Sequence, residues 1–512
     1  MISDALVAKL CDRVAASTAD TFSTVDVFTG GTLAKVPRSS PEDVAEAVEA
    51  ARKAQQVWAG VTVDNRIPVF ERFHALLLEH TDEILDILQA ETGKSRKDAF
   101  LEVCAPLVTV GYYARKAPKL LAPQRRQGML PGVVKTTELR VPKGVVGTIT
   151  PWNYPFALAF MDIIPALIAG NGVVLKPDTQ TALCTLYGVD LLYQAGLTQG
   201  LLQVVIGDGP VVGTAIVDNA DYIGFTGSTR TGREIAARAG RRLIGYSLEL
   251  GGKNPLLVLG DANTRQAAVG AVQTCFSNSG QLCMSPERLF VHTGVYDDFV
   301  ARFLGEVKRM NLAAGYDYSA DMGSLNSQRQ LETVIKHVED ARSKGATVLT
   351  GGKARPEIGP FFYEPTVLTD VTPEMLCYDN ETFGPVVSIY RVADDTAAIE
   401  RANATSYGLN ASVFTKSIAH GELVAAQLKA GTVHINDGHV VGLGSADAPM
   451  GGMKDSGIGR RNGAEGILKY TESQNVSVQR VPLTTPPRWL PFGWYVKSMQ
   501  GLLRLIRRAN IR

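Results

Sequence analysis

Cys283 is the first residue whose type and surroundings suggest chemistry. It follows a polar turn that contains a glycine, in the segment FSNSGQLCMSPER (276–288). A turn of this kind gives substrate access to a thiol, and its backbone N–H groups help to hold a thiolate. Cys283 is therefore a candidate nucleophile. A single cysteine is more often a small core residue, and we expect Cys275, beside Phe276, to be one.

Two further polar residues have types that could assist a nucleophile. Glu249 ends an apolar strand and precedes a Gly-Gly turn in SLELGGKNP (247–255). Burial at such a position raises the pKa of a carboxyl group and makes it a general base. Asn153, in TITPWNYP (148–155), could donate its side-chain amide to an oxyanion. Taken alone, Glu249 also fits a capping or ion-paired glutamate, and Asn153 also fits a turn asparagine.

Several turns that follow apolar strands could bind a dinucleotide. In FTGSTRTG (225–232), a strand leads through a glycine to a helix N-terminus, which is a natural cradle for pyrophosphate. Lys176 ends a strand and could hold a ribose or a phosphate, and Glu381 lies in the Gly-Pro loop of NETFGPVV. The turn that contains Gly207, in VVIGDGPVVG, resembles a dinucleotide fingerprint, but the acidic residue expected after the following strand is not clear. We interpret Gly207 as part of a turn near the cofactor.

Alternating strands and helices are expected to position these residues. Helical periodicity is present over 41–60, and a second long helix is expected over 67–91. Short apolar strands are predicted in two blocks, at 145–150, 172–176, 202–207 and 222–225, and at 255–260, 288–293, 386–390 and 411–415. Strand and helix in alternation predict parallel sheets with crossover helices. The expected fold class is therefore α/β, with two doubly wound lobes.

Two segments lie outside this alternation. Residues 121–140 are expected to form an extended hairpin, and 471–480 a late strand that pairs with it. Our hypothesis is that these segments form a sheet shared between subunits. The tail WLPFGWYVKSMQGLLRLIRRANIR (489–512) has the pattern of a basic amphipathic helix. It fits either a neighbouring subunit, which the sequence alone slightly favours, or an anionic membrane surface.

Composition narrows the class of protein. The 512 residues are 45% hydrophobic and 20% charged, with a net charge of +1, which predicts large buried cores and no binding of nucleic acid. Six cysteines occur without a CxxC pair or a Cys/His cluster of metal-ligand spacing. We therefore expect neither a metal site nor a disulfide framework, and a cytoplasmic location.

The motifs together, in this order, resemble the aldehyde dehydrogenase superfamily from about residue 25 to 480. The segments that carry the resemblance are PWN (151–153), KP (176–177), FTGS (225–228), ELGGKNP (249–255), GQLC (280–283), ETFGP (381–385), YGLNASVFT (407–415) and PMGGMKDSGIGR (449–460). Within that superfamily the chain is most similar to NADP-dependent succinate-semialdehyde dehydrogenases, particularly an actinobacterial branch. The resemblance implies two doubly wound lobes with an oligomerisation extension, and a homodimer or a dimer of dimers.

The resemblance also implies domain boundaries. Residues 1–120 and 141–250 would form the dinucleotide-binding domain, and 251–450 the catalytic domain. Residues 121–140 and 466–485 would form the oligomerisation extension, and 486–512 the basic tail.

The resemblance implies a role for each motif residue. Cys283 would attack the aldehyde carbon, the Asn153 side chain and the Cys283 N–H would hold the oxyanion, and Glu249 would activate water. The residues expected to bind the cofactor are Thr150, Pro151, Trp152, Asn153, Lys176, Thr179, Gly207, Gly227, Ser228, Leu250, Glu381 and Phe383. Relatives that prefer NAD often carry a glutamate at the position of Thr179. Its absence removes repulsion against a 2′-phosphate, so we expect NADP, with NAD possible.

The substrate residues depart from the pattern of succinate-semialdehyde dehydrogenases. Those enzymes clamp the substrate carboxylate with a serine, here Ser445, and with two arginines, here replaced by Met161 and Ser277. Phe156 is expected nearby. Overall similarity thus favours succinate semialdehyde, whereas the substitutions favour an apolar aliphatic or aromatic aldehyde. A non-catalytic binding protein on the same fold is a third alternative, against which stand the retained Cys283, Glu249 and Asn153.

Overall fold

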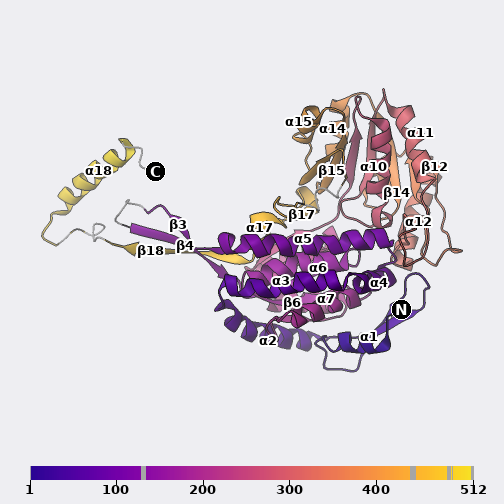
Figure 1. Cartoon of the computed structure of the whole chain (residues 1–512). Helices are drawn as coiled ribbons and strands as arrows, with labels where there is room; N and C mark the ends of the chain where they lie inside the picture. Colours follow the sequence, from indigo (N-terminus) through magenta and orange to yellow (C-terminus); the bar gives the residue numbers. More distant parts are fainter. Residues whose placement is uncertain (1, 129–133, 439–444, 481–485, 487, 509–512) are drawn as a thin grey trace.

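The structure, a computed structural model, describes residues 2–128, 134–438, 445–480, 486 and 488–508. These residues form two α/β lobes and an arm of extended strands that projects from the first lobe (Figure 1). The arm leads towards the C-terminal helix, which Figure 1 draws beyond its tip.

The first lobe is built on a six-stranded sheet in the order β17-β9-β8-β5-β6-β7. Five of the strands are parallel, and β17 pairs with β9 in the antiparallel direction. The bounds of these strands are β5 Val145–Ile149, β6 Gly172–Lys176, β7 Leu202–Val204, β8 Tyr222–Thr226, β9 Gly245–Glu249 and β17 Gly457–Ile458. Because the chain runs outward from β5 in both directions, the sheet has a switch point between β5 and β8, where ligands bind in open α/β sheets.

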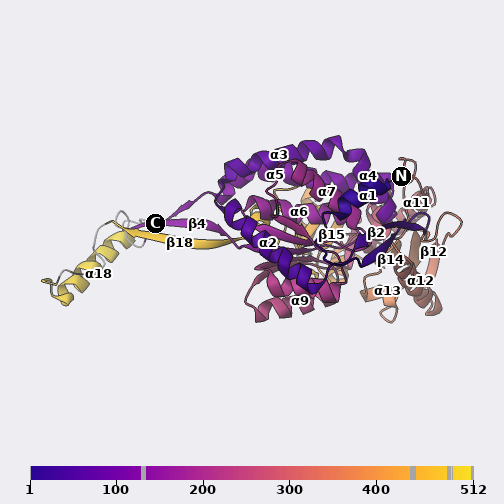
Figure 2. The same ribbon diagram turned by 90° about the horizontal axis from the view of Figure 1, so that it is seen from below.

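Helices cover both faces of this sheet, because its strands bury side chains on both sides. Along β5, Val145 and Ile149 pack into one cluster and Val146 into the other, which is the two-residue period of a strand. One face carries α2, α8 and α9, and the opposite face carries α3, α4, α5, α6 and α7. The bounds of the helices are α1 Asp4–Cys11, α2 Pro41–Ala59, α3 Val63–Glu79, α4 Thr81–Thr92, α5 Arg96–Leu121, α6 Pro155–Ile168, α7 Ala182–Gln194, α8 Thr214–Asn219 and α9 Thr229–Arg241. Figure 2 shows the lobe from the side of α2 and α9.

The expectation of one helix over 67–91 was wrong, because α3 and α4 are separate helices that meet at His80. His80 has φ −100° and ψ 22°, outside the helical range. The Thr81 hydroxyl donates to the carbonyl oxygens of Leu77 and Leu78 at 2.9 and 3.0 Å, which satisfies the last turn of α3. Because this junction contains no glycine or proline, the apolar periodicity continues across it, and the sequence pattern predicted a single helix.

The second lobe contains a seven-stranded sheet in the order β12-β13-β14-β11-β10-β15-β16. Its strands are parallel except for the edge strand β12. The strand bounds are β10 Asn254–Val258, β11 Pro286–His292, β12 Thr347–Thr350, β13 Thr366–Thr369, β14 Val386–Val392, β15 Asn410–Phe414 and β16 Thr432–Ile435. The helices are α10 Thr264–Phe276, α11 Tyr296–Val307, α12 Gln328–Ser343, α13 Leu376–Asp379, α14 Asp395–Asn403 and α15 Ile418–Ala425. The α/β class is confirmed, with one antiparallel edge strand in each sheet.

The chain returns to the first lobe after residue 450. Strand β17 pairs with β9 at Leu248 and Glu249, and α17 (Gly463–Leu468) packs against α5 and α6. The residues between the expected catalytic domain and the extension, 451–465, therefore complete the first sheet. A short N-terminal hairpin, β1 (Thr21–Val25) with β2 (Thr32–Pro37), lies apart from both large sheets.

The arm is a three-stranded antiparallel sheet of β3 (Gln124–Arg126), β4 (Val134–Pro142) and β18 (Thr471–Gln479). It confirms the expected hairpin and its late partner strand: β18 pairs with β4 over its full length, from Thr471 opposite Pro142 to Gln479 opposite Val134. The C-terminal helix α18 (Phe492–Arg508) follows. Within the described residues, no helix combines the length and the apolar character that crossing a bilayer requires.

Candidate active site

The candidate site lies where the two lobes meet, because the connection between their sheets is short. Glu249 is the last residue of β9 in the first sheet, and Asn254 is the first residue of β10 in the second. The carboxyl ends of β5 and β8 lead directly to Pro151–Trp152 and Gly227–Ser228. The site therefore combines the switch point of the first sheet with the loops at the amino ends of β10 and β11.

The nucleophile loop is held by contacts on both sides of Cys283. Cys283 lies in the turn that precedes β11, and its carbonyl oxygen accepts a hydrogen bond of 2.7 Å from the Asn254 side chain. Before it, Asn278 and Ser279 adopt left-handed backbone conformations with φ of 49° and 56°. Side chains in such conformations carry strain that the surrounding structure must offset. The loop is thus a constrained turn rather than a mobile one, as a fixed nucleophile requires.

Gly280 brings this loop against the loop that carries Glu381. Its φ of 71° is left-handed, and a Cβ at this position would overlap the carbonyl oxygen of Gly384. The glycines of the GQLC and ETFGP motifs therefore allow the two loops to meet backbone to backbone. Cys275, by contrast, is buried in α10 within the second core, as expected.

Glu249 has the environment of a general base. Burial raises the pKa of its carboxyl group to about 7, and the cations of Arg461 and Lys469 oppose this rise. The same burial, together with the carboxylates of Glu249 and Glu381, raises the pKa of the Cys283 thiol to about 12. A thiol of that pKa holds its proton at neutral pH, so its reaction requires a neighbouring group that accepts the proton.

A buried charge cluster behind Glu249 sets its surroundings. Asp162, on α6, accepts hydrogen bonds from Arg461 at 2.6 Å, from Lys469 at 3.2 Å and from the Tyr470 hydroxyl at 3.1 Å. Burial raises the pKa of the Asp162 carboxyl group, but its two cations outweigh this and leave the pKa below its usual range. The sequence pattern did not reveal this cluster, since Asp162 and Arg461 are 299 residues apart in the chain.

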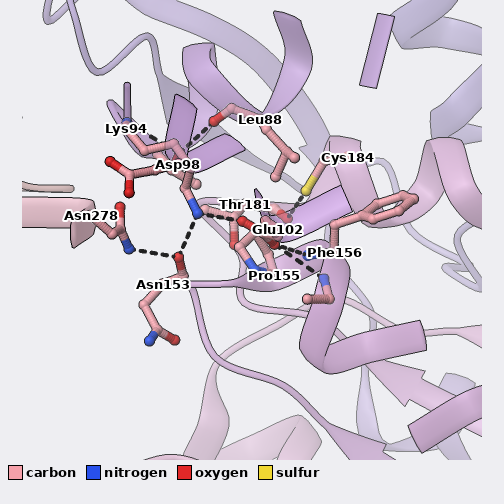
Figure 3. A network of polar contacts seen from close by, with 12 residues as sticks. Leu88, Lys94, Asp98, Glu102, Asn153, Pro155, Phe156, Thr181, Cys184 and Asn278 are labelled. Carbon is pink, nitrogen blue, oxygen red and sulfur yellow. Dashed lines mark hydrogen bonds and ion pairs between the residues drawn. The ribbon is translucent and has the colours of Figure 1, made fainter. Parts of the chain in front are cut away.

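Asn153 is positioned by a second buried pair, Lys94 and Glu102, both fully buried (Figure 3). Lys94 Nζ donates to the Asn153 carbonyl oxygen at 2.8 Å and pairs with the Glu102 carboxylate. Glu102 Oε1 accepts from the backbone N–H groups of Phe156 and Ala157 at 2.8 and 3.1 Å, at the start of α6. We call this arrangement the Lys94–Glu102 clamp. Through these bonds, the clamp holds the segment 153–157 against α5 and against Lys94, which precedes that helix.

The amide of Asn153 remains available as a donor. Its Nδ2 donates to the Gln281 carbonyl oxygen at 3.0 Å, in the nucleophile loop. An amide nitrogen has two N–H groups, so this bond leaves a second donor. The backbone carbonyl of the same residue also accepts from Asn278 Nδ2 at 3.0 Å, which further fixes the segment (Figure 3).

A groove on one side of Cys283 has the lining expected for a dinucleotide. It contains ten of the predicted cofactor and catalytic residues together with Thr226 and Gly251, and its lining is Pro151, Trp152, Asn153, Thr226, Gly227, Ser228, Glu249, Leu250, Gly251, Cys283, Glu381 and Phe383. Trp152 and Phe383 meet edge to face across it, with ring centroids 5.4 Å apart. Ser228 lines the groove and is the N-cap of α9, so the N-terminus of that helix, where a phosphate could bind, lies at the groove.

The Glu381 carboxylate indicates that the groove suits a bound group. It accepts a hydrogen bond from the Gly252 N–H at 2.9 Å, and burial raises the pKa of its carboxyl group to about 8. A Cβ at Gly251 would overlap the Glu381 carboxylate, so the glycine keeps that carboxylate at the groove wall. A ribose diol would supply hydrogen bonds to Glu381.

Four of the expected cofactor residues lie outside the lining of this groove: Thr150, whose buried hydroxyl has no hydrogen-bond partner among the described residues, and Lys176, Thr179 and Gly207. Lys176 ends β6, where burial lowers the pKa of its amine, and Nζ donates to the Pro177 carbonyl oxygen at 3.1 Å. The carboxylate of Asp208 acts on the amine of Lys176, which places the turn after Gly207 near that strand end. Lys176, Thr179 and Gly207 therefore lie at or just after the carboxyl ends of the neighbouring strands β6 and β7.

An apolar cavity of about 170 Å³ opens on the other side of Cys283. Helices α5 and α6 supply most of its wall through residues at helical spacing, with the nucleophile loop closing one end. Its lining is Leu101, Glu102, Cys104, Ala105, Val108, Asn153, Tyr154, Ala157, Leu158, Met161, Leu282, Cys283, Met284 and Met450. None of these described residues is a cation, and the Glu102 carboxylate is already committed to the Lys94–Glu102 clamp. Asn153 and Cys283 line both this cavity and the groove.

The structure brings Met161 to the cavity but not Phe156, Ser277 or Ser445. Phe156 is fully buried in the first core against Phe160. The Ser277 hydroxyl donates to Asp98 at 2.7 Å and lines a separate, more polar hollow with Lys97 and Arg309. Ser445 accepts from the Ala448 N–H at 3.3 Å and follows residues 439–444, which lie outside the described part of the chain.

Comparison with known proteins supports the family resemblance seen in the sequence motifs. The family model of the aldehyde dehydrogenase family matches residues 14–476. A protein of Mycolicibacterium smegmatis named "Putative succinate-semialdehyde dehydrogenase (NADP+)" is 56% identical over 483 residues, which cover 94% of this chain and 93% of that protein. A protein of Mycobacterium tuberculosis H37Rv with the same name, numbered 2, is 52% identical over the same shares. The NAD+ complex of an aldehyde dehydrogenase from Bacillus cereus superposes with a TM-score of 0.89 at 36% identity, covering 94% of this chain and 99% of that one.

Proposed function

Because the chain belongs to the aldehyde dehydrogenase family, we propose that it oxidises apolar aldehydes to carboxylic acids at Cys283, with NADP as the preferred hydride acceptor. One observation carries the substrate class: the Cys283 thiol lies at the end of an apolar cavity to which no described lining residue brings a positive charge. A terminal carboxylate in that cavity would be desolvated without a cationic partner, which costs several kcal/mol.

The chain's own groups divide the reaction between them. Glu249 accepts the proton of the Cys283 thiol, and the sulfur attacks the aldehyde carbon to form a C–S bond. The second N–H of the Asn153 amide and the Cys283 N–H hold the resulting oxyanion, and one such donor is typically worth about 3–4 kcal/mol. The dinucleotide, when bound, supplies the acceptor for the hydride that leaves this carbon. Glu249 releases its first proton to solvent and then takes a proton from water, whose oxygen attacks the thioester carbon. The C–S bond breaks, the Cys283 sulfur takes this proton from Glu249, and the acid leaves.

The groove residues support a dinucleotide, and the strand end of β6 supports the choice of NADP. Trp152, Gly227, Ser228, Leu250 and Glu381 would hold its nicotinamide and phosphate parts. Thr179 carries no charge that would repel a 2′-phosphate, and Lys176 lies three residues before it. The M. smegmatis relative's name, which specifies NADP, favours the same choice; the B. cereus enzyme was solved with NAD+.

Succinate semialdehyde is the second candidate substrate, because it appears in the names of both mycobacterial relatives. The deciding experiment measures kcat/KM for succinate semialdehyde, hexanal, decanal and benzaldehyde, with NADP and NAD in parallel. We expect an apolar aldehyde with NADP to lead. The Cys283→Ala variant should lose activity with every substrate, while Cys11→Ala, a matched loss of one distant thiol, should keep it. A kcat/KM for succinate semialdehyde far above those of hexanal and benzaldehyde would contradict the proposal.

Met161 provides a direct test of the missing charge. Met161→Arg adds a cation to the cavity wall, and a charge-assisted hydrogen bond contributes about 1.5–3 kcal/mol. We therefore expect kcat/KM for succinate semialdehyde to rise about tenfold or more, and that for hexanal to fall. Met161→Leu is the matched control, because it keeps an apolar side chain of similar volume and should leave the ratio of the two values unchanged. A ratio that Met161→Arg leaves unmoved would show that Met161 does not set the substrate class.

A further inference from the structure

The C-terminal helix α18 (Phe492–Arg508) has no buried residue, although half of its side chains are apolar. Phe492 is 66% exposed and Leu503 is 49% exposed. Figure 1 draws the helix beyond the tip of the arm, apart from both lobes. A large exposed apolar face on an otherwise polar surface marks a binding surface.

The apolar side chains of α18 form one continuous face. Phe492, Val496, Leu503 and their neighbours follow steps of three and four residues, and the full face is Phe492, Tyr495, Val496, Met499, Leu502, Leu503 and Ile506. Because a helix turns once in 3.6 residues, these seven side chains occupy about one third of its circumference. Among the large apolar side chains of the helix, only Trp494 and Leu505 fall outside the face.

The cations of the helix lie outside that face. Lys497, Arg504 and Arg508 repeat at steps of seven and four residues, which aligns them in one row opposite the middle of the apolar face, and all three are exposed. Arg507 flanks the apolar face, between it and this row. A long basic side chain beside an apolar face can place its charge at lipid headgroups, and cations on the polar side add attraction to an anionic surface.

The charge of the tail is separate from that of the rest of the chain. The whole sequence has 52 basic and 51 acidic residues, and no aspartate or glutamate follows Glu472, whereas seven lysines and arginines do. The preceding 472 residues therefore hold 45 basic and 51 acidic residues. A surface helix that docks on protein usually mixes both signs of charge, whereas a segment of one sign with an apolar face complements an anionic surface.

We propose that α18 lies on anionic membrane surfaces, with its apolar face in the headgroup boundary, Arg507 against lipid phosphates, and the row of Lys497, Arg504 and Arg508 on the polar side within the field of the anionic surface. The helix is 17 residues long and carries four cations, so it lies in the surface rather than crossing it. The proposal holds whichever aldehyde the active site takes, because no residue of α18 lines the groove or the cavity.

Co-sedimentation of the full chain with vesicles tests this, using phosphatidylcholine vesicles with and without phosphatidylglycerol. We expect the protein to pellet with the anionic vesicles and to stay in solution with the neutral ones. The double substitution Arg504→Gln/Arg508→Gln should weaken the partitioning by about tenfold or more, because each cation near an anionic surface contributes about 1 kcal/mol. Leu503→Ser/Ile506→Ser should weaken it as well, through loss of the apolar face.

The matched control is Arg265→Gln/Arg329→Gln, which removes the same charge from two exposed arginines of the second lobe. It should partition like the unchanged protein, and dehydrogenase activity in solution should be equal in all variants. Equal pelleting with neutral vesicles, or pelleting that neither α18 double substitution reduces, would overturn the proposal. So would a smaller particle in sedimentation velocity after deletion of residues 486–512, since that result would assign the helix to contact with a second copy of the chain.

Discussion

The proposed role of Glu249 as general base predicts that the rate of this enzyme depends on pH in a defined direction. Its carboxyl group has a pKa of about 7 because it is buried, and it accepts protons only when it is ionised. About one tenth of the molecules hold it ionised at pH 6 and about nine tenths at pH 8. We expect kcat to rise through pH 7 and then level off, as measured by initial rates at saturating aldehyde and cofactor.

Glu249→Gln should slow both halves of the reaction. The amide can take a proton neither from the Cys283 thiol nor from water, so both the attack on the aldehyde and the hydrolysis of the thioester should slow. Stopped-flow absorbance should then show no fast burst of reduced cofactor, and a slow steady state that no longer rises through pH 7. A variant that keeps full steady-state turnover would remove Glu249 from the role of base.

At the level of single residues, the sequence was sufficient where a functional group ends a strand or follows a glycine turn. Glu249, Cys283 and Asn153 were expected from such places, and the structure brings all three to one groove. Phe156 shows how the prediction could have been sharper. On α6, Met161 and Ala157 are one turn apart and face the cavity, whereas Phe156 and Phe160 share the face that packs into the core.

At the level of elements, the Lys94–Glu102 clamp joins α5 to the start of α6 and so fixes the Asn153 segment. Glu102→Gln would remove the negative charge beside a fully buried lysine while keeping the side chain's size. Breaking a buried ion pair on one side typically costs about 3–5 kcal/mol. We expect a loss of this order in the free energy of unfolding in urea, and a lower kcat from a displaced Asn153.

The control for the clamp is Lys97→Met. Lys97 is on the same helix as Glu102, and the substitution breaks its surface ion pair with Asp321. Both of its side chains are nearly half exposed, so water and salt already screen them, and the stability loss should be much smaller. Equal effects of the two substitutions would mean that the buried pair does not hold α6. Sequence reasoning did not find this clamp, because charged residues at helical spacing usually belong to a solvated face.

At the level of the whole molecule, the three-stranded arm presents an exposed sheet face in a single copy of the chain. All residues of β18 after Thr471 are exposed, including Val476 at 39% and Val478 at 49%, which point to the same face. We propose that this face joins subunits. Val476→Lys/Val478→Lys should therefore reduce the particle mass in sedimentation velocity, because each lysine would have to be desolvated in the contact.

Ser477→Lys is the matched control for the arm, since its side chain points to the opposite face and its hydroxyl lies 3.3 Å from that of Thr136. It should leave the mass unchanged. If neither variant changes the particle mass, the subunit contact lies elsewhere. The pairing of β18 with β4 was predictable from two extended segments. A contact between subunits, by contrast, cannot be derived from a single copy of the chain.

The overall layout was accessible from the sequence because strand and helix alternate regularly in both lobes. What alternation could not reveal is the return of the chain to the first lobe, since Gly457–Ile458 is too short to stand out as a strand. The same limit hid Arg461 and Lys469, whose meaning comes only from their contact with Asp162 on α6. Local patterns predict elements, whereas contacts between distant elements decide the charge environment of the site.

The closing of the first sheet by β17 has a consequence for synthesis on the ribosome. Asp162 and Glu249 are translated about two hundred or more residues before the arginine and lysine that surround them. At roughly 5–20 residues per second, the nascent first lobe waits on the order of ten seconds or longer for its missing edge strand and its cations. During that interval it holds an open sheet edge and acidic groups that cannot yet be buried. The N-terminal half of this protein is therefore the half that finishes folding last.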